Sequence, residues 1–153
     1  MKVAHPVLLI LTLLMGSCTP VDFEYADGTG GRYSDWRGHW IFINYWAEWC
    51  APCRYEIPQL NALDKGEPTN HVRVIGVNYD GIDGEALRAL MQRMGVEFRV
   101  MTQDPRERFG YQMPVVLPTT VVINPKGEVS ATLVGPQTEE TLREVMEVSD
   151  APT

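Results

Sequence analysis

Two cysteines separated by two residues, Cys50 and Cys53, constrain this chain more than any other feature of its sequence. They follow an apolar, aromatic run over residues 41–46, which predicts a buried strand, and a helix is expected from about Pro52. Cys50 would then lie at the helix cap and point outward, with Cys53 in the first turn, close enough for a disulfide. The helix dipole would lower the pKa of the Cys50 thiol, and a thiolate is the form that attacks a disulfide. The more buried Cys53 would resolve the mixed disulfide.

The same cysteine spacing has two other interpretations. It can form half of a zinc site, but the chain has no second such pair, and only His39 and His71 lie beyond the first 18 residues. It can also form a structural disulfide, although so short a loop gives little entropic stabilisation. A redox-active dithiol is the favoured interpretation, and we expect no metal and no bound cofactor.

The composition fits one globular domain with a sizeable core, because 44% of the 153 residues are hydrophobic and 22% are charged. The net charge of −7 and the lack of a run of Lys and Arg argue against nucleic acid as a partner. Anionic lipid would repel such a chain, so attachment to a membrane needs an anchor rather than a basic patch.

The first 18 residues have an export pattern. Lys2 gives a positive start, residues 7–15 form an apolar run too short to span a bilayer, and Gly16 and Ser17 precede Cys18. The segment resembles the bacterial lipoprotein signal, in which the chain is cleaved before a cysteine that then carries lipid. We therefore expect a signal peptide over 1–17 and lipidation of Cys18, with an ordinary cleaved secretory signal as the alternative. With either signal, we expect the domain to be exported to the periplasmic side of the cell envelope, where disulfides persist.

Apolar runs and turn signals predict alternating strands and helices after a polar, glycine-rich segment with a short strand of its own. Strands are expected over 40–46, 72–78, 98–101, 119–123 and 129–134, and helices over about 52–64, 84–94, 105–109 and from Thr138. Asp83 is expected to cap the second helix, and Gly95 to end it. This order predicts an α/β domain with a mixed central sheet and helices on both faces.

Two motifs resemble the thioredoxin superfamily. The dithiol stretch looks like its active site, with the sequence Trp46-Ala47-Glu48-Trp49-Cys50-Ala51-Pro52-Cys53, and a second stretch, Leu117-Pro118-Thr119-Thr120, resembles its cis-proline loop. Asn44, Glu56 before Pro58, the leader, and a long connection with room for an inserted strand–helix segment are similar to the membrane-attached TlpA/ResA/DsbE-like branch. The resemblance implies a thioredoxin-like domain over 35–150, after a tether and an N-terminal strand and turn over 18–34.

The resemblance also implies roles for side chains around a Cys50–Cys53 disulfide. Cys50 would be the nucleophile, Cys53 the resolving cysteine, and Glu56 a proton relay, although an exposed surface carboxylate is the alternative for Glu56. Supporting roles fall to Asn44 and Pro52. The residues expected to contact substrate are Trp49, Leu117, cis-Pro118 and Thr119, whereas Trp46 is expected in the core and Glu48 as a solvated loop charge.

These features predict an exported thiol–disulfide oxidoreductase that reduces a disulfide in a partner protein. The family suggests cytochrome c maturation or the assembly of a copper site, a membrane electron donor of thiol type, and a monomer held by its lipid anchor. A Sco-like copper-binding chaperone is one alternative, although the pattern of that group is Cys-x-x-x-Cys with a distant histidine, and the spacing in this chain is shorter. A peroxiredoxin-like peroxidase, with antioxidant activity, is the other.

Overall fold

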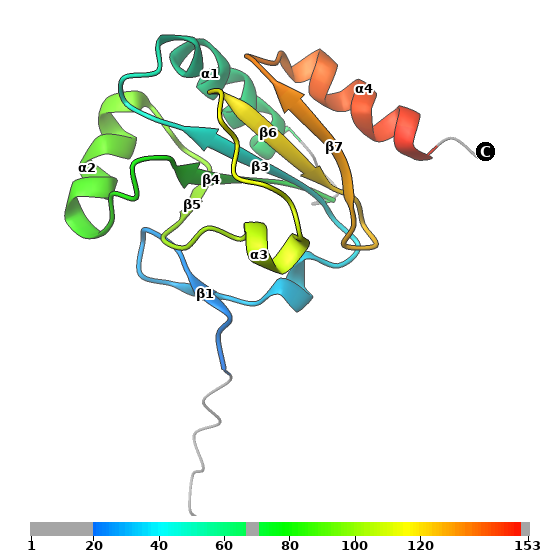
Figure 1. The fold of residues 1–153 in the computed structure, drawn as a ribbon, viewed down its shortest axis with the longest axis horizontal. Coiled ribbons are helices and arrows are strands. Elements are labelled where there is room, and N and C mark those ends of the chain that lie inside the picture. The colour runs from blue at the N-terminus through cyan, green and yellow to red at the C-terminus, as the bar shows by residue number, and fades with distance from the viewer. Residues whose placement is uncertain (1–19, 67–70, 151–153) are drawn as a thin grey trace, which may run out of the picture.

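The computed structural model describes residues 20–66 and 71–150, so the expected signal peptide and Cys18 lie outside the described residues. Figure 1 shows the arrangement of the elements. In chain order they are β1 (Phe23–Glu24), β2 (Gly30–Gly31), the 3-10 helix η1 (Tyr33–Trp36), β3 (Trp40–Trp46), α1 (Ala51–Lys65), β4 (Val72–Asn78), α2 (Gly84–Met94), β5 (Arg99–Met101), α3 (Arg106–Phe109), β6 (Thr119–Ile123), β7 (Val129–Val134) and α4 (Glu139–Asp150).

β3 is the central strand of a five-stranded mixed sheet with the order β5-β4-β3-β6-β7. It pairs in parallel with β4 and antiparallel with β6, and all seven of its residues are buried. An unbroken apolar and aromatic run is what a strand covered on both faces requires, because each successive side chain meets a different layer of the core. The predicted α/β architecture with a mixed sheet is confirmed. The inserted segment of strand and helix that the resemblance implied corresponds to α2 and β5.

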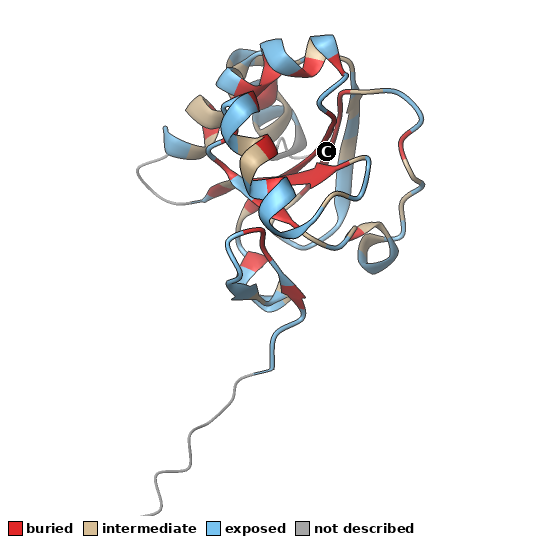
Figure 2. Ribbon diagram, turned by 90° about the vertical axis from the view of Figure 1, so that its left-hand side faces the viewer, coloured by how far each residue is buried: buried red, intermediate tan, exposed pale blue. Residues whose placement is uncertain are grey.

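The two faces of the sheet are covered differently. Phe42 and Trp46 belong to a core that includes side chains of α1, α2 and α4. Ile43 and Tyr45 point the other way, into a core formed with β1, η1 and the short α3. Helices therefore lie on both faces, but the three long ones share one face. Figure 2 shows the buried residues gathered along the sheet and on the inner sides of the elements that cover it.

The expected short strand near the N-terminus is β1, which pairs with β2. Phe23 and Tyr25 are buried in the second core, and a Cβ at Gly31 would lie 2.3 Å from the Phe23 ring. Glycine at this position lets the second strand of the hairpin lie close against the aromatic ring. The N-terminal hairpin is thereby packed onto the domain.

The helix ends follow the sequence signals with one exception. Gly95 ends α2 in the left-handed conformation, with φ 70°, as expected of a glycine C-cap. Asp83 lies at the N-cap, but its side chain makes no capping hydrogen bond, so the capping prediction is wrong in that respect. Of the helices in residues 20–66 and 71–150, none is both long enough and apolar enough to cross a membrane.

Candidate redox site

Cys50 and Cys53 are joined by a disulfide at the N-terminus of α1. Cys50 is the N-cap residue, and its Sγ accepts a hydrogen bond from the Cys53 N–H at 3.3 Å, with Pro52 in the first turn. In a reduced molecule, this donor and the helix dipole would stabilise a Cys50 thiolate. The outward orientation expected for Cys50 is not what this oxidised form has, because Cys50 is only 3% exposed and Cys53 is fully buried.

The Leu117–Pro118 peptide bond is cis, and it lies at the same end of the sheet as the disulfide. Tyr45 of β3 is in register with Thr119 of β6, so the next residues outward, Trp46 and Pro118, flank each other where β3 runs into the loop that carries Cys50. Leu117 packs against the core cluster that contains both cysteines. The cis-proline loop is therefore a wall of the site.

Thr119, which was expected to contact substrate, has its hydroxyl hydrogen-bonded within the protein. Its Oγ1 donates a hydrogen bond to the Val116 carbonyl at 2.8 Å, and the residue is buried. This bond fastens the loop before Pro118 onto the start of β6, so the hydroxyl holds the shape of the loop.

Glu56 is a buried carboxyl group three residues after Cys53, and only 1% of its surface is exposed. Residues three apart in a helix lie on one face, so Glu56 lies on the same face of α1 as Cys53. It accepts hydrogen bonds from Asn44 Nδ2 at 2.8 Å, from the Gln137 N–H at 3.2 Å and from Thr120 Oγ1 at 3.5 Å. Burial raises the pKa of Glu56 to about 7, although the three donors oppose that rise. The exposed-carboxylate alternative is excluded, and this group can exchange a proton near neutral pH.

Asn44 is the polar residue of β3 that links Glu56 to β6. It lies in register with Thr120, and its Nδ2 donates to Glu56 Oε2 and, at 2.9 Å, to Thr120 Oγ1. Its Oδ1 is buried and has no partner among the described residues. A side-chain amide has both donors and an acceptor. A flipped Asn44 amide would therefore present its Oδ1 as an acceptor to Glu56 once that carboxyl group is protonated.

Trp49 stands beside the disulfide with 65% of its surface exposed. Its Nε1 donates to the Asp80 carboxylate at 3.0 and 3.2 Å, and its ring lies edge-on to Tyr79 at 6.3 Å between centroids. The loop after β4 therefore fixes the orientation of an exposed aromatic side chain at the mouth of the site. Trp46, by contrast, is fully buried, as expected.

Glu48 is an exposed loop residue, as expected, and it also makes an ion pair that the sequence did not indicate. Its carboxylate forms an ion pair with Arg93 of α2 at 3.1 Å, and Arg54 donates to its main-chain oxygen at 2.9 Å. The pair is half-exposed, so it contributes little to stability, but it ties the loop before Cys50 to α2.

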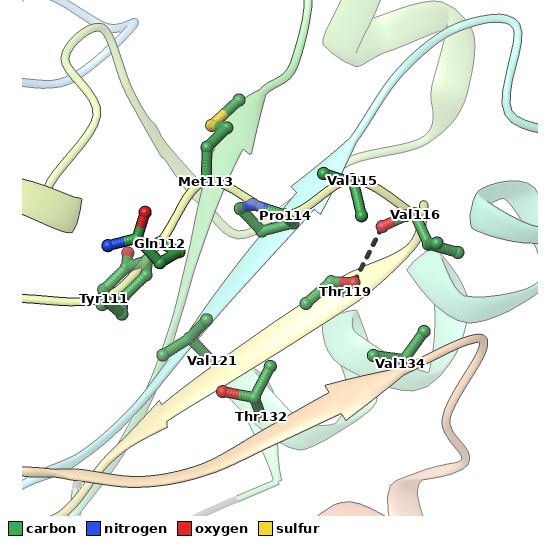
Figure 3. A pocket seen from close by; sticks show the side chains of 10 residues that line it. All are labelled: Tyr111, Gln112, Met113, Pro114, Val115, Val116, Thr119, Val121, Thr132 and Val134. Atoms are coloured by element: carbon green, nitrogen blue, oxygen red, sulfur yellow. Dashed lines mark hydrogen bonds between the residues drawn. The ribbon is translucent and has the colours of Figure 1, made fainter.

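An uncharged groove of about 280 Å³ lies next to the cis-proline loop (Figure 3). One wall is the segment that leads to Leu117, and the floor is formed by β6 and β7. Val115 is 90% exposed, and Val116 and Val134 are also largely exposed. The residues that line the groove are Tyr111, Gln112, Met113, Pro114, Val115, Val116, Thr119, Val121, Thr132 and Val134.

Sequence reasoning missed several residues of this site. Thr120 interrupts an apolar strand in the same way as Asn44, and that signal could have found it. The Gln137 N–H and the Asp80 carboxylate had no sequence signal, because folding brings them in from distant loops. His39 and His71 lie near each other, with ring centroids 6.2 Å apart, but the described residues contain no group of three or more side chains suited to a metal ion.

Comparisons with known proteins agree with this arrangement. Residues 16–132 match the family model described as AhpC/TSA family. The chain is 33% identical over 133 residues to the thiol-disulfide oxidoreductase ResA of Bacillus subtilis, covering 86% of this chain and 73% of that protein. It is 26% identical over 110 residues to the sporulation thiol-disulfide oxidoreductase A of the same organism, covering 71% of this chain and 67% of that protein.

A solved structure of similar fold is the thiol:disulfide interchange protein, a thioredoxin family protein, from Chlorobium tepidum. It superposes with a TM-score of 0.69 at 25% identity, over 82% of this chain and 90% of that one. The similarity extends over most of both chains.

Proposed function

The chain belongs to the AhpC/TSA family and is a thiol–disulfide oxidoreductase with a thioredoxin fold, and from that premise we propose that it reduces a disulfide in an exported partner protein. The observation that carries this proposal is the placement of Glu56, a carboxyl group with a pKa of about 7, one helical turn after Cys53. Reduction of a disulfide requires a proton to leave the resolving thiol, and this group can accept it.

The proposed reaction transfers two electrons. The Cys50 thiolate attacks one sulfur of the partner's disulfide, and that disulfide breaks to give a mixed disulfide and a partner thiolate, which takes up a proton. Cys53 then gives its proton to Glu56, and its thiolate attacks Cys50 Sγ. The mixed disulfide breaks, the second partner thiolate leaves and is protonated, and the Cys50–Cys53 disulfide forms. The partner gains two electrons and takes up two protons, one on each sulfur. This protein loses the two electrons, and its own two protons leave when the Cys50 thiolate forms and when Glu56 releases the proton of Cys53 to solvent.

A polypeptide is the proposed substrate because of the surface around the disulfide. The cis-Pro118 loop offers backbone groups to an extended chain, and Trp49 offers an exposed ring held in place by Asp80. The uncharged groove beyond Val116 extends this surface and suits an apolar side chain of the partner. Two partner classes fit this chemistry: an apocytochrome c with a haem-attachment Cys-x-x-Cys, and a copper-delivery protein with oxidised cysteines.

The proposed location is the periplasmic side of the bacterial cell envelope, with the chain cleaved after residue 17 and anchored by lipid on Cys18. The export pattern of residues 1–18 supports it, as does the chemistry, because a partner disulfide persists only outside the reducing cytosol. In this proposal a thiol-type donor in the membrane restores the dithiol, and the anchored protein works as a monomer whose domain spans 35–150.

Replacement of Cys50 tests this function. The purified, reduced protein is expected to reduce the disulfides of insulin, and Cys50→Ser is expected to abolish that activity. Cys18→Ser is the matched control and should keep the full rate, because the proposed reaction does not use that cysteine. Turnover by Cys50→Ser would contradict the proposal. Cys53→Ser should accumulate the mixed disulfide, which identifies the partner.

A further inference from the structure

Three cationic side chains gather in one place although they are far apart in the sequence. In the described residues, Arg37, Arg108 and Lys126 are the Lys and Arg side chains that make neither an ion pair nor a hydrogen bond. Of the others, some pair with carboxylates: Arg32, Lys65, Arg93, Arg99, Arg106 and Arg143. The rest donate to oxygen or imidazole: Arg54, Arg73 and Arg88. The three cations left over all line the same hollow.

We name this feature the cationic hollow and define it by Arg37, Arg108 and Lys126. Its floor is aromatic: Trp36 and Phe109 stack with ring centroids 5.8 Å apart, and the Arg108 guanidinium lies 5.6 Å from the centre of the Tyr33 ring. It has a volume of about 80 Å³, and no carboxylate lines it. An open hollow of about 510 Å³ adjoins it and shares Tyr33, Arg37 and Arg108.

The adjoining hollow has one carboxylate, Asp22, which accepts the Tyr33 N–H at 2.8 Å and keeps its negative charge, so the two hollows together hold three cations and one anion. The feature therefore presents a concentrated positive charge on a chain whose net charge is −7. Unpaired cations around a concave surface are suited to phosphate oxygens, and arginine in particular binds them with its planar fork of donors.

The cationic hollow lies at the opposite end of the sheet from the disulfide. The Gly38 N–H donates to the Pro125 carbonyl at 2.9 Å, which fixes the turn with Lys126 beside the start of β3. Cys50 follows the other end of that strand. Seven residues of strand separate the two ends, which amounts to about 20 Å. In Figure 1, β1 and α3 lie together on the side of the sheet away from α1.

The chain reaches the domain at this same place. Asp22 lines the adjoining hollow, and Val21 before it is largely exposed. Three residues lie between Cys18 and Asp22, so an anchor on Cys18 would be at most about 14 Å away, which is four residue steps of an extended chain. An anchor this short requires the surface around the cationic hollow to face the membrane.

We infer that the cationic hollow binds the phosphate groups of an anionic membrane and orients the anchored domain with its dithiol pointing away from the bilayer. This inference rests on the anchoring part of the proposed function. Lys and Arg close to a membrane gain attraction to anionic lipid that adds to an anchor already present, whereas the rest of this acidic surface is repelled. The partner disulfide and the thiols of the membrane donor must then reach a site about 20 Å or more above the bilayer.

Amine labelling of the membrane-attached full chain tests this inference, because Lys126 and Lys65 are the two lysines of the described residues and lie in different places. Lys65 ends α1 and pairs with Glu97. The chain is attached to vesicles of phosphatidylcholine alone, or with about one-third phosphatidylglycerol. We expect labelling of Lys126 to fall at least about threefold on the anionic vesicles, labelling of Lys65 to stay unchanged, and about 0.5 M sodium chloride to reverse the difference.

A pair of double variants supplies the control. Arg37→Gln with Arg108→Gln should remove the protection of Lys126, whereas Arg88→Gln with Arg143→Gln changes the charge equally, on α2 and α4, and should keep it. Equal labelling of Lys126 on both kinds of vesicle, or equal protection of both lysines, would overturn the inference. Millimolar inorganic phosphate that protects Lys126 as well without vesicles would assign the hollow to free phosphate and overturn it too.

The same samples separate this inference from the proposed function. Insulin reduction should be equal in both double variants, so a loss of activity counts against the redox assignment rather than the membrane surface. A chain that does not float with neutral vesicles refutes the anchor. Flotation with anionic vesicles that depends on Arg37 and Arg108 would still support the phosphate contact. The absence of such flotation would refute both the anchor and the phosphate contact.

Discussion

Asn44 and Tyr45 are neighbours in β3, yet they take part in two buried polar clusters of different character. Asn44 faces α1 and binds Glu56, together with Thr120. Tyr45 faces α3, and its hydroxyl donates to Asp104 Oδ1 at 2.7 Å and lies 3.0 Å from the Tyr111 hydroxyl. One strand therefore carries two polar networks, one on each face of the sheet.

The difference lies in which groups can change charge. Burial raises the pKa of Glu56 to about 7, so this carboxyl group can change its charge near neutral pH. Burial also raises the pKa of Tyr45 and of Tyr111, but the ordinary pKa of a tyrosine is already 10, so both hydroxyls stay neutral. The same physical effect brings a carboxyl group into use for proton transfer and makes a pair of phenols inert. The first cluster is therefore suited to chemistry, and the second to holding the segment before the cis-proline loop.

The largest expected difference between the clusters is in the rate of disulfide reduction. Glu56→Gln keeps the shape of the side chain but removes the proton acceptor, so the rate of thiol oxidation near pH 7 should fall by about 10²-fold or more. Tyr45→Phe should change that rate by less than about twofold, since it lies on the other face. Rapid-mixing fluorescence with a protein disulfide measures both, and similar losses in the two variants would abolish the distinction.

The second largest effect is on stability as a function of pH. The folded-state pKa of Glu56 lies above its unfolded value of 4.5, so its neutral form is favoured by folding. The free energy of unfolding of the oxidised protein should fall by up to about 3 kcal/mol as the pH rises from about 4.5 to about 7, and then level off. Denaturant titrations of Glu56→Gln should be flatter across this window, and parallel curves for the two proteins would contradict the assignment.

A smaller effect is expected from Tyr45→Phe on stability. The substitution removes the hydroxyl that donates to Asp104 and leaves the Tyr111 hydroxyl without that partner. The free energy of unfolding should fall by about 1–2 kcal/mol. Because the phenols stay neutral, the loss should be the same between about pH 6 and about pH 8, where surface carboxylates are ionised. A loss that varied with pH would mean that the second cluster also exchanges a proton.

The smallest effect is expected from Thr120→Val. The substitution removes a donor that lowers the pKa of Glu56, so the midpoint of the pH–rate profile should move upward by a fraction of a pH unit. Thr119→Val is the matched control, because the Thr119 hydroxyl donates to Val116 instead. Thr119→Val should leave the midpoint in place, and equal shifts in both variants would show that the Thr120 hydroxyl has no special relation to Glu56.

Local patterns in the sequence predicted the features that depend on neighbouring residues. The apolar run of β3 and the cysteine spacing specify the strand, the helix start and the disulfide, and Gly95 specifies where α2 ends. Features set by strand register were not predictable in the same way. Thr120 meets Glu56 across 64 residues, and the bond from Tyr45 to Asp104 spans 59.

Charged residues show the same limit. Sequence composition indicated an acidic surface that anionic lipid repels, and Glu48 was expected to be solvated. Glu48 is indeed exposed, but its ion-pair partner Arg93 was not predictable from the sequence. Arg37, Arg108 and Lys126 come together only because η1, α3 and the β6–β7 turn meet at one end of the sheet. The choice of partner for a long charged side chain depends on tertiary placement, which periodicity and spacing do not contain.

The reduction potential of the Cys50–Cys53 couple tests the central claim most directly. A protein that reduces partner disulfides needs a dithiol that gives up electrons readily. Equilibration of the purified protein with glutathione or dithiothreitol buffers should give a potential close to about −270 mV, as in thioredoxin. A potential close to about −120 mV, as in a strong oxidant, would contradict the account and assign the protein to the formation of disulfides.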